Sequence, residues 1–165
     1  MDDQLIRQLN KAIELRKEGQ LKSSNQLILQ LVTEYPEDPV VNYQCAWSYD
    51  VLGEEAHAVP FYEKAIELGL SDEWLEGAYL GLGSTFRTLG EYEKSQQILK
   101  EAINHFPNNY ALKVFYSMTL YNLKEHSIAM ETLLESLLET TKDEEILKYK
   151  KAIHFYSDKL DEVWK

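Results

Sequence analysis

An internal repeat is the feature that most constrains how this chain can fold. Three glycines, Gly19, Gly53 and Gly90, mark three repeats of one pattern along the 165 residues. A small residue lies seven positions before each glycine, and another lies five positions after it. These small residues are Ala12 and Ser24, Ala46 and Ala58, and Gly83 and Ser95. A period of about 34 residues indicates a stack of similar supersecondary units.

A fourth repeat keeps the same spacing but lacks the glycine. Ser117 and Ala129 occupy its small positions, and Lys124 stands where the turn glycine belongs. Between the second and third repeats, residues 69–75 contain an insertion of three residues in which Ser71 is a candidate N-cap. We therefore expect the first helix of the third repeat to be longer by about one turn.

Each repeat is predicted to form two helices that are joined at its glycine. Apolar residues recur at helical spacing on both sides of the glycine, and no stretch alternates with a period of two. Glycine ends the first helix because the left-handed conformation costs little without a Cβ atom. Paired small residues, such as Gly83 and Ser95, allow the two helices to cross closely. Pro36 and Pro107 end the second helices of their repeats.

The third repeat carries the fullest pattern: Tyr79-x-x-Leu82-Gly83-x-x-Phe86, Gly90-x-Tyr92, Ser95-x-x-x-Leu99-x-x-Ala102 and Pro107. This pattern resembles the tetratricopeptide repeat signature, and the other three repeats resemble it more loosely. The stretch Tyr43-Gln44-Cys45-Ala46-Trp47 is also similar to a small family of uncharacterised bacterial tetratricopeptide proteins. The resemblance implies an all-α fold, in which about four helix-turn-helix hairpins form a right-handed superhelical stack with a C-terminal capping helix. It also implies recognition of other proteins through the concave face, and self-association.

We expect one domain over residues 1–165. Its repeats cover about residues 5–38, 39–72, 76–109 and 110–143, and a C-terminal helix follows over residues 144–164. Thr141 and Glu144 have the spacing of a capping box at the start of that helix. The apolar residues of the helix are three and four positions apart: Ile146, Tyr149, Ile153, Tyr156, Leu160 and Val163. Such a narrow seam fits either a cap over the last hairpin or a dimerisation helix.

Composition excludes several classes of partner. The formal net charge of −11 opposes binding to a phosphate backbone, so we expect no nucleic acid. A single cysteine, Cys45, cannot form an intramolecular disulfide. No basic segment leads into an apolar run, and no apolar run approaches the length of a membrane span. The sequence therefore predicts a cytoplasmic protein without a membrane partner.

The sequence predicts no enzyme, no cofactor and no metal site. Its four histidines lack the spacing of a helical zinc pair. Cys45 has no histidine or basic residue near it on its helix, which favours a buried thiol over a nucleophile. The stretch Gly81-Leu82-Gly83 lacks the other residues of a phosphate loop and any preceding strand. Close helix packing accounts for Gly83, and the sequence offers no account of Gly81.

The first helices carry a stripe that we predict to line a concave groove. Its members are Leu9, Ile13 and Arg16 in the first repeat, Tyr43, Trp47 and Asp50 in the second, Leu80, Ser84 and Arg87 in the third, and Val114, Met118 and Tyr121 in the fourth. An apolar groove with aromatic residues favours a scaffold that binds a peptide or helix of another protein. The alternative is that neighbouring helices or the C-terminal helix already cover these side chains.

Two further interpretations concern the partner. Some tetratricopeptide domains hold a terminal carboxylate with lysine and asparagine on their first helices, but the matching positions here are Leu9 and Ile13. A carboxylate clamp is therefore not expected, and the apolar groove better suits a partner with an apolar strip or an amphipathic helix. The competing function is a homodimeric structural protein that associates with itself through its apolar surface or its C-terminal helix.

Overall fold

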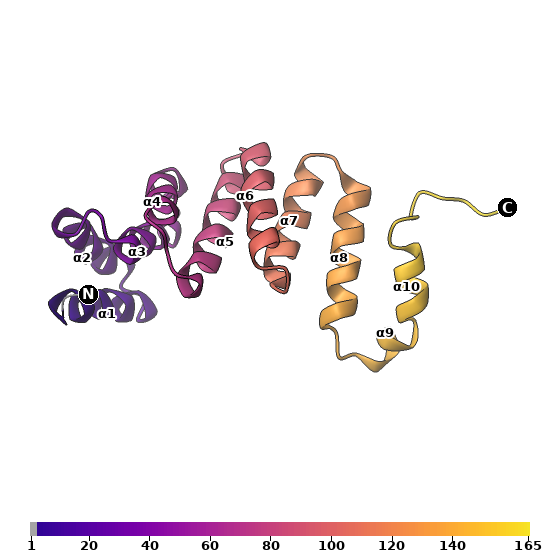
Figure 1. Ribbon diagram of the computed structural model, residues 1–165, viewed down its shortest axis with the longest axis horizontal. Helices are drawn as coiled ribbons and strands as arrows, with labels where there is room; N and C mark the ends of the chain where they lie inside the picture. The colour runs from indigo at the N-terminus through magenta and orange to yellow at the C-terminus, as the bar shows by residue number, and fades with distance from the viewer. Residues whose placement is uncertain (1–2) are drawn as a thin grey trace. The chain divides into compact units, whose positions relative to one another are not determined.

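The computed structural model describes residues 3–165, and its regular elements are ten α-helices. They are α1 (Asp3–Lys17), α2 (Leu21–Glu34), α3 (Pro39–Asp50), α4 (Glu55–Glu67), α5 (Asp72–Thr88), α6 (Tyr92–His105), α7 (Tyr110–Asn122), α8 (His126–Thr140), α9 (Glu144–Lys148) and α10 (Lys150–Tyr156). Consecutive helices form hairpins (Figure 1), which confirms the predicted all-α repeat fold. The chain divides into two compact units, here called the N-terminal unit (Met1–Gly90) and the C-terminal unit (Glu91–Lys165).

In the N-terminal unit, α1 pairs with α2, α3 pairs with α4, and α5 packs against both α3 and α4. Its core includes one cluster around Leu5, Leu31 and Val41, which come from α1, α2 and α3. The close helix crossing predicted from the small residues is present in the first repeat. The Ser24 hydroxyl donates a hydrogen bond of 2.7 Å to the backbone carbonyl of Ala12, and both residues are buried. A side chain longer than serine would separate α1 from α2 at this point.

In the C-terminal unit, α6 packs against α7, α7 pairs with α8, and α10 lies on α8. The hydroxyl groups of Ser95 and Thr119 are 2.8 Å apart and join α6 to α7. The side chain of Asn109 caps α7 by accepting a hydrogen bond from the backbone N–H of Leu112 at 3.2 Å. These contacts fix α6, α7 and α8 as one packed group.

The turns between paired helices follow the sequence pattern. Gly19, Gly53 and Gly90 adopt positive φ angles of 79°, 73° and 79°. Lys124 takes the same place in the fourth repeat and also has a positive φ of 68°. The backbone therefore keeps the left-handed turn even where the glycine is missing, although a lysine is strained there.

The insertion before the third repeat lengthens its first helix as predicted. Helix α5 has 17 residues, whereas α3 has 12. Ser71 lies at the N-cap position of α5, but its side chain makes no capping hydrogen bond. The extra turn brings Trp74 and Gly77 of α5 onto Tyr43 of α3, where they contribute to the surface described below.

The C-terminal segment differs from the single helix predicted over residues 144–164. It forms the short helices α9 and α10, which break at Tyr149, and the regular helix ends at Tyr156. Asp143, rather than Thr141, is the N-cap, because its carboxylate accepts a hydrogen bond from the Ile146 N–H at 3.0 Å. A helix whose apolar seam is unpacked gains little from tertiary contacts, so its continuity is weakly supported. Within residues 3–165, no helix is both long enough and apolar enough to span a bilayer.

Candidate protein-binding surfaces

Trp47 lies where the three first helices of the N-terminal unit meet. The guanidinium carbon of Arg16, from α1, is 3.9 Å from the centroid of the Trp47 ring on α3. The Tyr43 ring is 5.9 Å from the Trp47 ring and 5.8 Å from the ring of Trp74 on α5. Trp47 nevertheless keeps 40% of its surface exposed. A large indole is thus fixed by its neighbours and still open to a partner.

Arg16 is buried beneath this indole with little to neutralise its charge. Only 9% of its surface is exposed, and its Nη2 donates a hydrogen bond of 2.6 Å to the Gln44 side-chain oxygen. Within residues 3–165 its Nη1 has no hydrogen-bond partner. Burial lowers the pKa of Arg16, although the nearby hydroxyls of Tyr43 and Tyr62 oppose that shift. The contact between this cation and the face of the Trp47 ring offsets part of the free-energy cost of burying the charge.

Asp50 joins α3, α4 and α5 beside this surface. Its carboxylate accepts hydrogen bonds from the Tyr62 hydroxyl at 2.6 Å and the Thr85 hydroxyl at 3.0 Å. Burial raises the pKa of Asp50, and these two hydrogen bonds partly oppose the shift. A small cavity of about 200 Å³ lies here, between Asp50, Glu55, Ser84, Thr85 and Thr88. Because the Asp50 carboxylate already accepts hydrogen bonds from two side chains of α4 and α5, we assign this network a structural role.

The structure accounts for Gly81, which the sequence left unexplained. A Cβ atom at Gly81 would lie 2.3 Å from the Tyr62 hydroxyl oxygen and 2.4 Å from the ring carbon that bears it. A Cβ atom at Gly77 would lie 2.5 Å from the Tyr43 hydroxyl oxygen. The two glycines are four residues apart and share one face of α5. They let the α5 backbone approach the tyrosines that support Trp47 and Asp50.

The predicted stripe in the N-terminal unit is only partly open. Leu9 is buried in the cluster with Leu5 and Leu31, and Tyr43 is buried among aromatic rings. These two side chains therefore pack in the interior and do not line an open groove, because the neighbouring helices cover them. Five members of the stripe are half-buried: Ile13, Asp50, Leu80, Ser84 and Arg87. Among the stripe residues of the N-terminal unit, Trp47 is the large apolar side chain that remains exposed.

The fourth-repeat members of the stripe belong to the C-terminal unit. Val114 is half-buried, while Met118 and Tyr121 are exposed. The centroid of the Tyr121 ring lies 4.8 Å from that of the His126 ring, and the two ring planes are tilted by 53°. Their role in binding stays a prediction, made separately for this unit.

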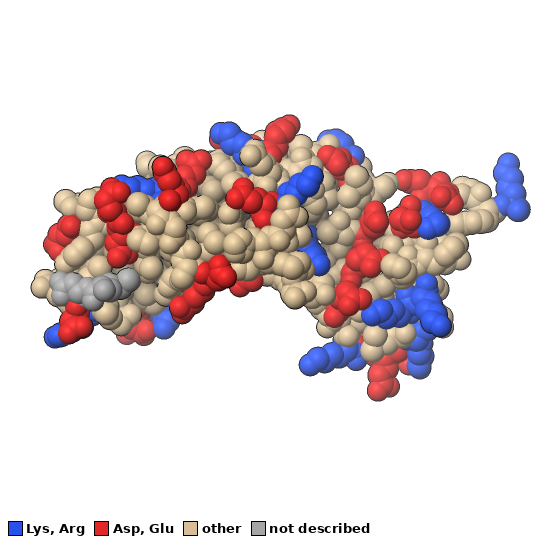
Figure 2. Space-filling model, in the orientation of Figure 1, with Lys and Arg blue, Asp and Glu red and all other residues tan. Residues whose placement is uncertain are grey.

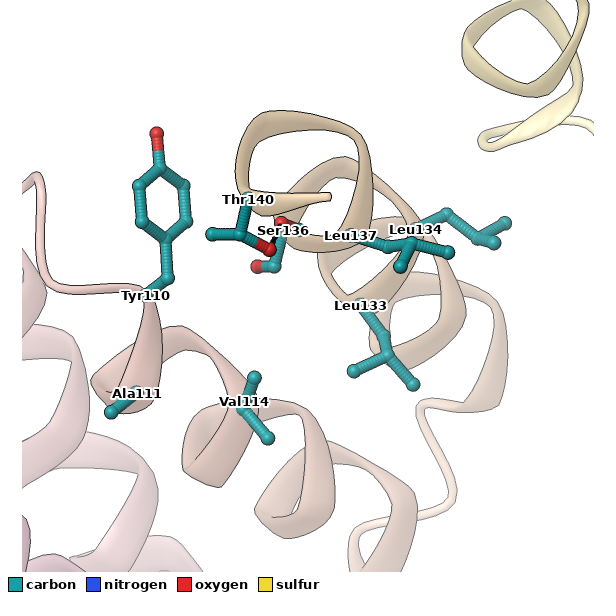
Figure 3. Close-up of a pocket in the computed structure, with 8 residues that line it drawn as sticks. All are labelled: Tyr110, Ala111, Val114, Leu133, Leu134, Ser136, Leu137 and Thr140. Carbon is teal, nitrogen blue, oxygen red and sulfur yellow. Dashed lines mark hydrogen bonds between the residues drawn. The ribbon is translucent and has the colours of Figure 1, made fainter. Parts of the chain in front are cut away.

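A second candidate surface is an apolar cavity of about 460 Å³ between α7 and α8. Its lining residues are Tyr110, Ala111, Val114, Leu133, Leu134, Ser136, Leu137 and Thr140. Figure 3 shows side chains of α7 and α8 facing each other across the opening, with Val114 opposite Leu133. Leu133 and Leu137 are each about 40% exposed. Val114 is the one member of this set that belongs to the predicted stripe, because that stripe was confined to first helices.

An aromatic cluster at the C-terminal end is a third feature that the stripe did not include. The Trp164 ring lies 6.3 Å from Phe155 and 5.5 Å from Tyr156, and the Phe155 and Tyr156 rings are 5.1 Å apart. All three side chains are about half exposed. The sequence feature that could have revealed this cluster is the presence of three aromatic residues in the last eleven positions.

Two observations describe the ionisable and metal-ligating side chains. Burial raises the pKa of the Cys45 thiol to about 12, which keeps it protonated near neutral pH. Among the described residues, no group of three or more histidine, cysteine, aspartate or glutamate side chains is placed to hold a metal ion. The exposed aromatic and apolar side chains are therefore the features from which we develop a function.

Comparisons with known proteins agree with the repeat architecture. Residues 39–160 match the tetratrico peptide repeat family. No curated protein matches the chain. Residues 41 to the end of MamA from Desulfovibrio magneticus RS-1 form a similar structure, with 16% identity, coverage of 95% of this chain and 90% of that chain, and a TM-score of 0.73.

Two other solved structures are similar. A tetratricopeptide repeat protein from Parabacteroides merdae ATCC 43184 has 17% identity and a TM-score of 0.67, with coverage of 93% of this chain and 62% of that chain. YrrB, described as a tetratricopeptide protein with an unusual peptide-binding site, has 15% identity and a TM-score of 0.63, with coverage of 94% and 91%. At these identities the likeness concerns the fold alone.

Proposed function

The chain belongs to the tetratricopeptide repeat family, whose fold is typical of protein–protein interaction, and we propose that it is a non-catalytic scaffold. In this proposal it holds a peptide or helix of another protein on the inner surface of the N-terminal unit. The single observation that carries the proposal is Trp47, which stays 40% exposed although Arg16 and Tyr43 fix its ring.

The energetics of recognition favour such a residue. Tryptophan, tyrosine and arginine dominate the small set of side chains that supply most of the binding energy at protein interfaces. A side chain that is already ordered loses little conformational entropy when a partner binds. Trp47 meets both conditions, because its ring is stacked on Arg16 before any partner arrives.

The surroundings of Trp47 indicate the chemistry of the partner. The indole, together with two half-buried members of the predicted stripe, Ile13 and Leu80, suits an apolar strip or one face of an amphipathic helix. Arg16 is buried beneath the indole and holds its ring in place, so the apolar face of Trp47 is the part of this site that a partner can contact. YrrB, with the same fold, is described as having a peptide-binding site, which is consistent with this class of partner.

The experiment is parallel affinity capture from the native cell with three baits: wild type, Trp47→Ala and Trp164→Ala. Both substituted tryptophans are at least 40% exposed, so both variants should fold. We expect the partner to be lost with Trp47→Ala and kept with Trp164→Ala. The loss should correspond to at least ~2 kcal/mol of binding free energy, as for an interface hot spot.

Thermal melts of the same variants test the placement of Trp47. A buried aromatic cut to alanine costs about 3–5 kcal/mol of folding stability, whereas an exposed anchor costs much less. We expect the melting temperature of Trp47→Ala to stay within a few degrees of wild type. If Trp47→Ala keeps every captured partner, this surface is not the binding site.

A further inference from the structure

We infer that the cavity between α7 and α8 is the docking site for the aromatic C-terminal end of a second copy of this chain. The interaction lies wholly within the C-terminal unit and does not depend on the proposed function of Trp47. Each copy carries one cavity and one aromatic cluster, so two copies can exchange ends and form a closed two-fold dimer.

The first reason is that the cavity occupies a position that the inner repeats cover. Leu133 corresponds in the repeat to Ile28, Tyr62 and Leu99, which are at most 2% exposed, whereas Leu133 is 40% exposed. In the first repeat, Cys45 of the following helix α3 packs against Ile28. In the second, Gly81 of the following helix α5 lies against Tyr62. After α8 this covering element is missing, so Leu133 and Leu137 remain open.

The second reason is that the chain's own C-terminal segment lies on a different face of α8. His154 Nδ1 is 2.6 Å from Glu135 Oε1, and the Ser157 hydroxyl donates to the same oxygen at 3.0 Å. Glu135 is two residues from both Leu133 and Leu137, which places it about 200° away around the helix. The segment is thus held on α8 by polar contacts while the cavity stays empty of it.

The third reason is that the exposed end of this segment has the shape and chemistry to fill such a cavity. The rings of Phe155, Tyr156 and Trp164 contact one another, and these residues are 52%, 46% and 57% exposed. Tyr156 meets both other rings edge to face, a favourable aromatic arrangement that orders the three side chains before a partner binds. Aromatic side chains are also effective anchors in apolar pockets. A cavity of about 460 Å³ with leucine and valine walls is large enough to accept such side chains.

Charge favours a second copy of the chain as the occupant. Residues 142–165 contain six lysines and six acidic residues, whereas residues 1–90 contain seven lysines and arginines but fifteen acidic residues. Figure 2 shows lysines gathered over α9 and α10, among acidic side chains. Two copies that meet through this segment avoid the repulsion that two acidic N-terminal units would create.

The exposed area is also sufficient for a weak dimer. An aromatic side chain offers about 150–250 Å², so three half-exposed rings offer on the order of 300 Å² per copy. With the exposed leucines of both copies, the reciprocal contact buries on the order of 1,000 Å². Specific interfaces begin at about that area. We therefore expect dissociation in the micromolar range, with a mass that depends on concentration.

Sedimentation equilibrium over a wide concentration range tests the dimer directly. We expect the mass to rise from the 19.2 kDa of one chain to twice that value. Trp164→Ala in the cluster and Leu137→Glu in the cavity should each raise the dissociation constant at least about tenfold. Trp47→Ala is the matched control, because it removes an exposed tryptophan outside both surfaces, and its dissociation constant should equal that of wild type.

A mixing experiment separates reciprocal exchange from other dimers. The Leu137→Glu chain keeps its aromatic cluster and the Trp164→Ala chain keeps its cavity, so one intact contact forms only in the mixed dimer. We expect native mass spectrometry to show more mixed dimer than either homodimer. A chain that stays monomeric at millimolar concentration overturns the inference, as does a dimer that neither substitution weakens. If Leu137→Glu fails to fold, Trp164→Ala decides alone, because the Trp164 side chain is exposed.

Discussion

The N-terminal and C-terminal units use equivalent repeat positions in opposite ways. Arg16, Asp50, Arg87 and Tyr121 occupy the same place in successive repeats. In the N-terminal unit, Arg16 is buried under Trp47 and Asp50 is bound by Tyr62 and Thr85. In the C-terminal unit, Tyr121 is 62% exposed. The repeat pattern therefore determines which face of a helix a residue occupies, whereas the neighbouring hairpin determines whether that residue is buried.

The same difference appears on the second helices. Ile28 and Tyr62 are covered by α3 and α5, while Leu133 faces the open cavity between α7 and α8. Burial of a leucine-sized side chain is worth about 1.5–3 kcal/mol. The N-terminal unit gains that stabilisation at positions where the C-terminal unit leaves apolar side chains exposed.

The largest expected effect comes from removing the close approach of α5 in the N-terminal unit. Gly81→Ala would place a methyl group 2.3–2.7 Å from three atoms of the buried Tyr62 ring system. We expect a loss of about 1–3 kcal/mol in the free energy of unfolding, despite the better helix propensity of alanine. Urea unfolding of the variant and of wild type measures this loss, and hydrogen exchange of the amides in α3 to α5 shows whether it falls in these helices.

Gly77→Ala provides the matched control for Gly81→Ala. Its methyl group would meet mainly the hydroxyl end of Tyr43, so Tyr43 can adjust by a smaller movement. We expect a clearly smaller loss than for Gly81→Ala. Equal losses for the two variants would contradict the specific role of Tyr62 in limiting the residue at position 81.

The sequence predicted the helices better than it predicted the surfaces. The helical hairpins, the glycine turns and the longer α5 followed from residue spacing, because these features depend on local backbone preferences, and the resemblance to the tetratricopeptide signature added the stacked fold class. Gly81 could not be explained from its own repeat, because the atoms that restrict it belong to Tyr62 of the preceding repeat. The burial of Leu9 and Tyr43 had the same kind of cause in neighbouring helices.

The C-terminal end was predicted least well. The apolar spacing of residues 146–163 is helical, but the structure ends the helix at Tyr156 and exposes much of the seam. The spacing of apolar residues predicts which side chains would lie on the same face of a helix. It does not predict whether another element packs against that face and buries it. Phe155 and Trp164 lie off the seam, and the spacing of apolar residues does not predict that the Trp164 ring contacts Phe155 and Tyr156 of α10.

A smaller effect is expected from the pH dependence of the N-terminal unit. Burial raises the pKa of Asp50 in the folded state, so the folded protein binds this proton more tightly than the unfolded chain does. The contribution to stability is therefore present below the unfolded pKa of about 3.9 and is lost as pH rises through the folded value. Asp50→Asn, which still accepts hydrogen bonds, should lack this decline.

Urea midpoints of wild type and Asp50→Asn at several pH values above 4 measure the difference. We expect the stability of the variant relative to wild type to increase with pH. The change should stay below that of Gly81→Ala, because Tyr62 and Thr85 offset part of the desolvation with hydrogen bonds worth about 0.5–1.5 kcal/mol each. A stability difference that does not vary with pH would mean that Asp50 titrates normally in the folded protein.

The smallest expected effect compares one turn in each unit. Gly53 and Lys124 occupy equivalent positions with φ angles of 73° and 68°, but only the lysine carries a side chain in this left-handed region. A left-handed residue other than glycine costs roughly 1–2 kcal/mol, and the greater flexibility of unfolded glycine returns about 0.5–1 kcal/mol of that. Lys124→Gly should therefore stabilise the C-terminal unit by about 0.5–1 kcal/mol, while Gly53→Ala should destabilise the N-terminal unit by a similar amount.

A Cβ atom at Gly53 would meet no atom within 4 Å, so the effect of Gly53→Ala would come from the backbone alone. Hydrogen exchange in α3 and α7 measures each change within its own unit. If Lys124→Gly proves neutral or destabilising, the lysine side chain must contribute contacts that outweigh the strain of its backbone, and the turns of the two units would differ in more than their glycine.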